Sequence, residues 1–210
     1  MSKLFRMDSP LMRFLTKIAD LMVLNILFCV TGIPLITIGA SWTALYSVTL
    51  KMVRDEEGSV SRSYFQSFRQ NFRQATLLWL VVLVVLALLV LDIRVLNGMA
   101  GGTTPGLLRA GVEILALLGI MVLQYLFPSL ARFEASLADT LKNACMMALA
   151  HLPKTALMTA AAVGAVWITL INNTTIAVGL MVWPLIGFAL MAFGNSGILR
   201  KIFDNYVPKA

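Results

Sequence analysis

Long stretches without a charged side chain constrain the fold of this chain more than any other feature. Residues 21–50 and 155–199 contain no Asp, Glu, Lys or Arg, and residues 75–91 form a further continuous apolar run. Of the 210 residues, 59% are hydrophobic and 13% are charged, whereas soluble domains usually carry about 25% charged residues. A helix of about 20 apolar residues crosses the hydrocarbon of a bilayer. The sequence therefore predicts an all-α integral membrane protein.

Charged and turn-forming residues divide the chain into about six predicted spans within a single polytopic membrane domain, residues 1–210. One helix over residues 21–50 would be about 45 Å long, more than the roughly 30 Å of hydrocarbon. Gly32 and Pro34 lie near its middle and would break it. The second span is short, so a re-entrant or kinked segment remains an alternative there. The predicted spans are residues 15–31, 35–53, 75–91, 107–131, 155–171 and 175–193.

The distribution of basic residues predicts the orientation. With six spans and both termini in the cytosol, all but two of the 17 Lys and Arg residues fall on the cytosolic side, the exceptions being Arg94 and Arg109. Cytoplasmic segments of membrane proteins are enriched in Lys and Arg. The pattern therefore indicates cytosolic N- and C-termini, and it accounts for the net charge of +7 without nucleic acid as a partner.

Two polar segments, residues 54–74 and 132–154, are predicted to lie in the cytosol. In the first, aromatic side chains recur at helical spacing and arginines occupy the other side or its flanks, as in an amphipathic interfacial helix. Such a helix lies on anionic lipid or against the bundle, or else it docks a partner, because Phe and Arg are favoured interface anchors. The candidate docking residues are Tyr64, Phe65, Phe68, Arg69, Phe72 and Arg73.

A weak internal repeat connects these cytosolic segments and the spans that follow them. Aligning Phe72 with Leu152 also aligns Leu77 with Leu157. One interpretation is a chain of two three-span halves, related by an axis along the membrane normal.

Small residues recur at helical spacing on two predicted spans. Such faces allow helix backbones to approach closely in lipid, either within the chain or against a partner. The predicted packing faces are Gly39, Thr43 and Ser47 on the second span and Ala156, Ala160 and Gly164 on the fifth.

Four charged residues near the predicted outer surface form a candidate polar or ion site. A charge in hydrocarbon is costly and therefore marks a place to look for function, although a surface cluster of ion pairs explains the same residues. The four are Asp92, Arg94, Arg109 and Glu113, of which Glu113 lies deepest. The uncharged Asn25 and Gln124, within spans, are expected to hydrogen-bond between helices.

The sequence contains no catalytic or cofactor-binding constellation. It lacks a GxSxG elbow, a Walker-type phosphate loop and a GxGxxG fingerprint. Its single histidine, His151, has no Cys, His or carboxylate at the spacing of metal ligands. We therefore expect no enzyme activity, no cofactor and no metal ion.

The segment from residue 34 to residue 75, PLITIGASWTALYSVTLKMVRDEEGSVSRSYFQSFRQNFRQA, resembles the signature region of the YesL-like bacterial membrane proteins, a family of unknown function. The matching features are Pro34, Thr37, Gly39, Ala40, Ala44, Tyr46, the turn at residues 51–58, and Phe65, Phe68, Asn71 and Phe72. The resemblance implies a multi-pass protein of the bacterial cytoplasmic membrane.

Members of that family are often encoded beside carbohydrate ABC-transporter components. The resemblance therefore implies a non-catalytic accessory subunit of an oligosaccharide uptake system, with the lipid bilayer and ABC permease or ATPase subunits as partners. One alternative is a stand-alone small-solute transporter or channel, whose cavity would need Glu113, Asp92, Asn25 and Gln124. A third, a membrane enzyme, lacks paired carboxylates or a histidine cluster.

Overall fold

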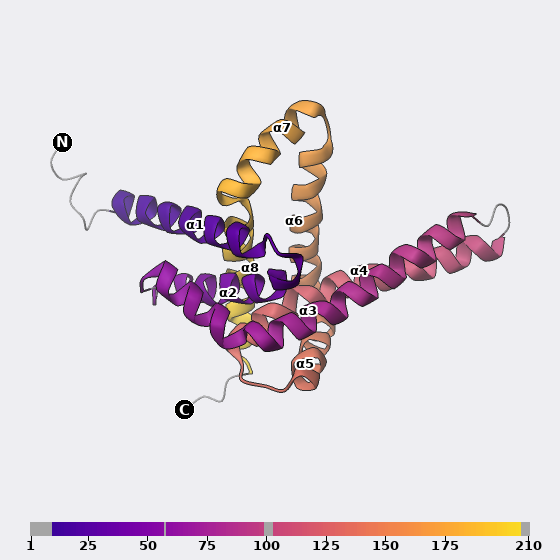
Figure 1. The fold of residues 1–210 in the computed structure, drawn as a ribbon, viewed down its shortest axis with the longest axis horizontal. Helices are drawn as coiled ribbons and strands as arrows, with labels where there is room; N and C mark the ends of the chain where they lie inside the picture. The colour runs from indigo at the N-terminus through magenta and orange to yellow at the C-terminus, as the bar shows by residue number, and fades with distance from the viewer. Residues whose placement is uncertain (1–9, 57, 99–102, 207–210) are drawn as a thin grey trace.

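Every regular element in the described part of the chain is helical. The computed structural model describes residues 10–56, 58–98 and 103–206, and Figure 1 shows how its helices are arranged. Five of its helical segments are long and apolar enough to cross a bilayer, which confirms the all-α membrane class. The elements are α1 Pro10–Gly32, η1 Leu35–Thr37, α2 Ile38–Met52, α3 Val60–Gly98, α4 Thr103–Arg132, α5 Leu137–Ala150, α6 Leu152–Leu170, α7 Asn173–Val182, η2 Trp183–Gly187 and α8 Phe188–Phe203.

The segment predicted as the second span differs from the other five. Residues 35–53 hold the short 3₁₀ turn η1 and the 15-residue helix α2, which is about 22 Å long and shorter than the roughly 30 Å of hydrocarbon. Eleven residues of α2 are buried, and α2 packs against α1, α3, α4 and α8. It is the central helix of the fold.

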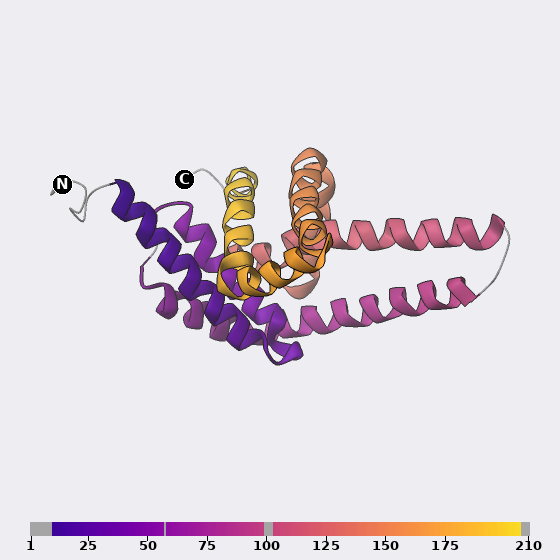
Figure 2. The ribbon, with the colours of Figure 1, turned by 90° about the horizontal axis from the view of Figure 1, so that it is seen from above.

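The predicted cytosolic helix and the predicted third span are one continuous helix. No Gly or Pro occurs between Val60 and Asn97, so nothing in the sequence breaks α3 over its 39 residues. At about 58 Å, α3 is far longer than the hydrocarbon is thick. Its outer half runs beside α4 to the far end of the molecule (Figures 1 and 2), and we call this α3–α4 pair the arm.

The second cytosolic segment is built differently. Ser136 caps α5, because its Oγ accepts a hydrogen bond from the Asp139 amide at 3.2 Å. The chain then leaves helical geometry at His151, and α6 begins at Leu152 with Pro153 in its first turn. The aligned segments of the weak repeat therefore differ: α3 is unbroken where α5 and α6 are separated.

The last predicted span extends beyond its predicted end. Residues 175–193 fall within α7, the π turn η2 and α8, and α8 continues to Phe203. At the start of α7, Asn172 and Thr175 form a reciprocal capping box. The hairpin of α6 and α7 rises away from α2 and lies crosswise to the arm (Figure 1).

Candidate functional site

Tyr64, the first predicted docking residue, lies in the core. Its side chain is fully buried, and its hydroxyl oxygen lies 2.6 Å from Oγ1 of Thr31 in α1. Thr31 Oγ1 also lies 2.9 Å from Oγ of Ser41 in α2. This three-hydroxyl contact joins α1, α2 and the start of α3, so Tyr64 anchors the helix and is not available to a partner.

The other predicted docking residues range from half-buried to exposed. Phe68 is half-buried and its ring lies 5.4 Å from the ring of Phe72. Phe65 and Phe72 are 46% and 39% exposed, and the arginines beside them are exposed as well. We call Phe65, Arg69, Phe72 and Arg73 the aromatic–basic surface.

The aromatic–basic surface is held in place from both ends. Tyr64 fixes it at one end, and at the other Nε2 of Gln74 donates a 2.7 Å hydrogen bond to the carbonyl of Ala135, just before α5. The surface therefore lies on an anchored part of the fold.

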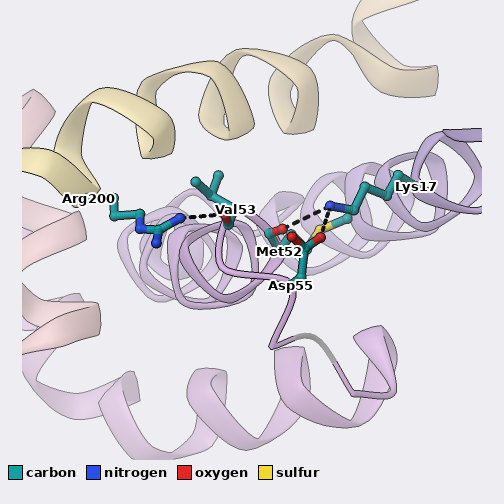
Figure 3. A network of polar contacts seen from close by, with 5 residues as sticks. All are labelled: Lys17, Met52, Val53, Asp55 and Arg200. Atoms are coloured by element: carbon teal, nitrogen blue, oxygen red, sulfur yellow. Dashed lines mark hydrogen bonds and ion pairs between the residues drawn. The ribbon is translucent and has the colours of Figure 1, made fainter. Parts of the chain in front are cut away.

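A cluster of charged residues closes the carboxyl end of α2 (Figure 3). Lys17 of α1 donates to the Met52 carbonyl at 3.2 Å and pairs with Asp55. Arg200 of α8 donates to the Val53 carbonyl at 2.9 Å. Cations are favourable at a helix C-terminus, where carbonyls lack partners within the helix. We call this group the α2 clamp.

Two further contacts complete the α2 clamp. Arg54, in the turn after α2, pairs with Asp204 at the end of α8, and Arg200 lies 3.8 Å from the same carboxylate. Asp55 adopts a left-handed backbone with φ 55°, a conformation that Asp and Asn tolerate better than most side chains. The hydrogen bond from Lys17, and then its charge, hold the pKa of the Asp55 carboxyl below its usual value.

Of the two predicted packing faces, the one on α2 lies inside the bundle, against α3. A Cβ added at Gly39 would lie 2.6 Å from the Ala75 carbonyl oxygen and 2.6 Å from Trp79 Cβ, both in α3. Thr43 is buried and donates to the Gly39 carbonyl, and Ser47 is half-buried. This face therefore packs within the chain.

The face on α6 points away from the bundle. Ala156 and Ala160 are exposed, and apart from the adjoining main chain of α6, no atom of the described residues lies within 4 Å of a Cβ added at Gly164. This face is open to lipid or to a partner helix.

The candidate polar site lies on the arm. Arg109 and Glu113 form an i, i+4 ion pair at 2.9 Å, with side chains 55% and 57% exposed. Arg109 also reaches Asn97 of α3 at 3.4 Å. Asp92 and Arg94 are exposed on the outer part of α3. The structure thus places the four residues on an exposed surface.

The two amides within spans do hydrogen-bond between helices. Gln124 of α4 donates from Nε2 to Thr159 Oγ1 of α6 at 2.6 Å, whereas its Oε1 is buried without a partner among the described residues. Asn25 of α1 is fully buried and contacts the main chain of η2 and α8. These bonds confirm that expectation.

Two hollows lie between the helices. A cavity of about 380 Å³ is lined by aromatic rings that include Phe28, Trp42, Trp79 and Phe127. A wider groove of about 720 Å³ separates α6 and α7 from η2 and α8. Among the described residues that line the two hollows, none is charged, and most are apolar. Within the described ranges, no three His, Cys, Asp or Glu side chains are grouped so as to hold a metal ion.

Known proteins similar to this chain support the resemblance drawn from the sequence. A family model described as "Protein of unknown function, DUF624" matches residues 21–93, which cover the second half of α1, all of α2 and most of α3. "Uncharacterized protein YesL" of Bacillus subtilis (strain 168) is 26% identical over 159 residues, 75% of this chain and 74% of the relative. No solved structure matches the chain.

Proposed function

We propose, from the assignment to the YesL-like family that these two matches support, that the chain is a non-catalytic accessory subunit of a carbohydrate ABC-type uptake system. It lies in the bacterial cytoplasmic membrane with both termini in the cytosol. The observation that carries the proposal is the aromatic–basic surface, where two large aromatic rings stay exposed on an anchored helix.

An interface at this surface has a physical rationale. Aromatic and Arg side chains are the commonest energetic anchors of protein interfaces. Ordering a surface on binding costs free energy, and a surface that is already held in place avoids part of that cost. Because Tyr64 and Gln74 fix the helix, Phe65 and Phe72 are presented to a partner with little loss of conformational freedom.

The lining of the two hollows supports an assisting role for the chain. A sugar needs several well-placed hydrogen-bonding groups, whereas these hollows are lined mostly by apolar side chains. The sugar is therefore bound by a partner permease, and this chain contributes the docking surface.

The alternative of a stand-alone transporter receives less support. Glu113 pairs with Arg109 on the exposed arm, Asp92 is exposed on α3, and the Asn25 amide is already occupied by main-chain groups. Of the four residues that such a cavity would need, Gln124 lines the mostly apolar cavity of about 380 Å³ and the other three line neither hollow, so the four do not converge on one polar pathway.

The test replaces the exposed rings of Phe65 and Phe72 and leaves the buried Tyr64, which anchors the helix, unchanged. The variant Phe65→Ser, Phe72→Ser is compared with a matched control, Leu137→Ser, Leu141→Ser, on the exposed side of α5, where the two leucines are 38% and 42% exposed. Each tagged variant is purified in mild detergent from the native host, and co-purifying permease or ATPase subunits are quantified by mass spectrometry.

The proposal expects the phenylalanine variant to lose about tenfold or more of the recovered partner, as truncation of interface anchors does. The leucine control keeps it. Equal recovery with both variants, each shown by size-exclusion chromatography to be folded, would contradict a docking role for this surface.

A further inference from the structure

The final apolar segment is interrupted at Pro184. Proline has no N–H to donate and crowds the preceding turn, and the π turn η2 adds one residue to the helical register there. The main chains of α7 and α8 are therefore not joined by an uninterrupted ladder of α-helical hydrogen bonds.

The Asn25 side chain of α1 binds the main chain at this interruption, and Sγ of Cys29, also in α1, lies 4.0 Å from the Pro184 carbonyl oxygen. Nδ2 of Asn25 donates to the carbonyls of Trp183 at 2.9 Å and Pro184 at 2.6 Å. Its Oδ1 accepts a hydrogen bond from the Ala189 amide at 2.8 Å. Asn25 is 0% exposed, so water does not replace these bonds if the side chain is removed.

The two helices that precede the interruption, α6 and α7, form a unit of their own. A Cβ added at Gly179 of α7 would lie 2.3 Å from Thr169 Cγ2 of α6, and Trp183 Nε1 donates to Thr169 Oγ1 at 3.1 Å. These contacts join the end of α6 to the second half of α7 and to the start of η2. Of the residues of α7, only Gly179 is buried, and α7 contacts chiefly α6 and η2.

The first half of α6, by contrast, is fixed to α4 by hydrogen bonds. Tyr125 and Thr155 are hydrogen-bonded at 2.8 Å, and Gln124 binds Thr159. Gly164 separates this fixed first half from the exposed C-terminal part of α6. A glycine within a helix destabilises the helix locally. The groove of about 720 Å³ lies between the hairpin and α8.

We propose that η2 is a hinge about which the α6–α7 hairpin moves relative to α8, and that Asn25 is the latch that holds the hairpin in the observed orientation. In the latched state, the Asn25 amide joins α1 to η2 and α8, beside the rings of Phe28 and Phe188, whose centroids lie 5.2 Å apart. When the three hydrogen bonds open, α7 swings on η2, the C-terminal part of α6 follows through Thr169, and the groove changes width.

Distances between spin labels across the hinge test this proposal. One label is placed at Leu180 of α7, which is 72% exposed, and the other at Lys201 of α8, also exposed. All proteins carry Cys29→Ala and Cys145→Ser, so that only the introduced cysteines react, and are measured in lipid nanodiscs; alanine is used at residue 29 because Cys29 Sγ lies 4.0 Å from the Pro184 carbonyl oxygen and a serine hydroxyl there could replace a latch bond. A second label pair, Ile26 and Lys201, joins α1 to α8 without crossing the hinge.

The latch variant is Asn25→Leu, and the matched control is Gln124→Leu. The control removes another interhelical amide bond that does not touch η2. The proposal expects Asn25→Leu to shift or broaden the distance distribution between residues 180 and 201, with the distribution between residues 26 and 201 unchanged. The control leaves both distributions as in the parent protein.

A folded Asn25→Leu protein with the parent distribution at both label pairs would overturn the proposal. Asn25→Ser, which is smaller and keeps one hydroxyl, provides the same test if Asn25→Leu does not fold. If neither variant folds, hydrogen exchange in the unmodified protein decides: a hinge requires faster exchange at residues 185–189 than at residues 192–199 of α8, and equal protection of the two segments overturns it.

Discussion

Gly39 of α2 lies directly against the main chain of Ala75 of α3. A Cβ at residue 39 would come within 2.6 Å of the Ala75 carbonyl oxygen, a distance that real side chains do not adopt. The two helices therefore meet backbone to backbone at this point. Since α2 is the central helix, this contact sets how closely the start of the arm packs on the core.

Gly39→Ala is expected to destabilise the protein. The added methyl group forces α2 and α3 apart, and overpacking of this kind costs about 1–3 kcal/mol. Gly164→Ala is the matched control, because no described atom outside the adjoining main chain of α6 lies within 4 Å of the added Cβ and Ala is favoured over Gly in a helix by up to about 1 kcal/mol. Thermal unfolding in detergent measures both variants. Equal melting temperatures for the two would contradict the close contact.

Tyr64→Phe is expected to lower stability although it removes only one oxygen. The hydroxyl of Tyr64 is buried and contacts Thr31 at 2.6 Å, and loss of such a hydrogen bond costs about 0.5–1.5 kcal/mol. Phe65→Leu, one residue away but exposed, should change stability by no more than about 0.5 kcal/mol. Chemical unfolding of the two variants distinguishes the anchor from the surface. A larger loss from Phe65→Leu would reverse the assignment.

Much of the helical framework could be predicted from the distribution of charge. The charge-free run at residues 75–91 lies within α3, and the predicted span at residues 155–171 almost coincides with α6. This works because a long uncharged run in a helix has few stable environments other than a bilayer. The uninterrupted course of α3 was missed, although the absence of Gly and Pro from residues 60–97 was a usable signal.

Burial and long-range pairing could not be predicted in the same way. In lipid, an apolar helix can face either the bilayer or other helices, so the composition of α2 did not reveal that it is central. For the same reason, the sequence did not show that the small residues on α2 face α3, whereas Ala156 and Ala160 on α6 face outward. The α2 clamp joins Lys17, Asp55 and Arg200, which only the fold brings together.

The Asp55 carboxylate predicts a pH dependence of stability. Because Lys17 lowers the pKa of Asp55 in the folded protein, the stabilisation is fully present above the unfolded value of about 4 and is lost as the pH falls through the lower, folded value. The melting temperature of the parent should exceed that of Asp55→Asn by a constant amount between about pH 5 and pH 8. The difference should shrink below about pH 4. A difference that grows in acid would contradict the pairing.

Glu113→Gln is expected to have little effect on stability. Exposed i, i+4 ion pairs contribute about 0.3–0.5 kcal/mol, and both partners here are more than half exposed. Solute uptake into liposomes provides a second measurement on the same variant. Uptake by the parent protein that disappears with Glu113→Gln would instead favour the transporter alternative.

The central claim, that the chain is an accessory subunit, is tested most directly by purifying the tagged parent protein from its native host in mild detergent. Mass spectrometry of the co-purifying proteins then gives their identity and stoichiometry. We expect permease or ATPase subunits of a carbohydrate ABC system in fixed ratio to the chain. Recovery of the chain alone, as a monomer or a homo-oligomer, would contradict the claim.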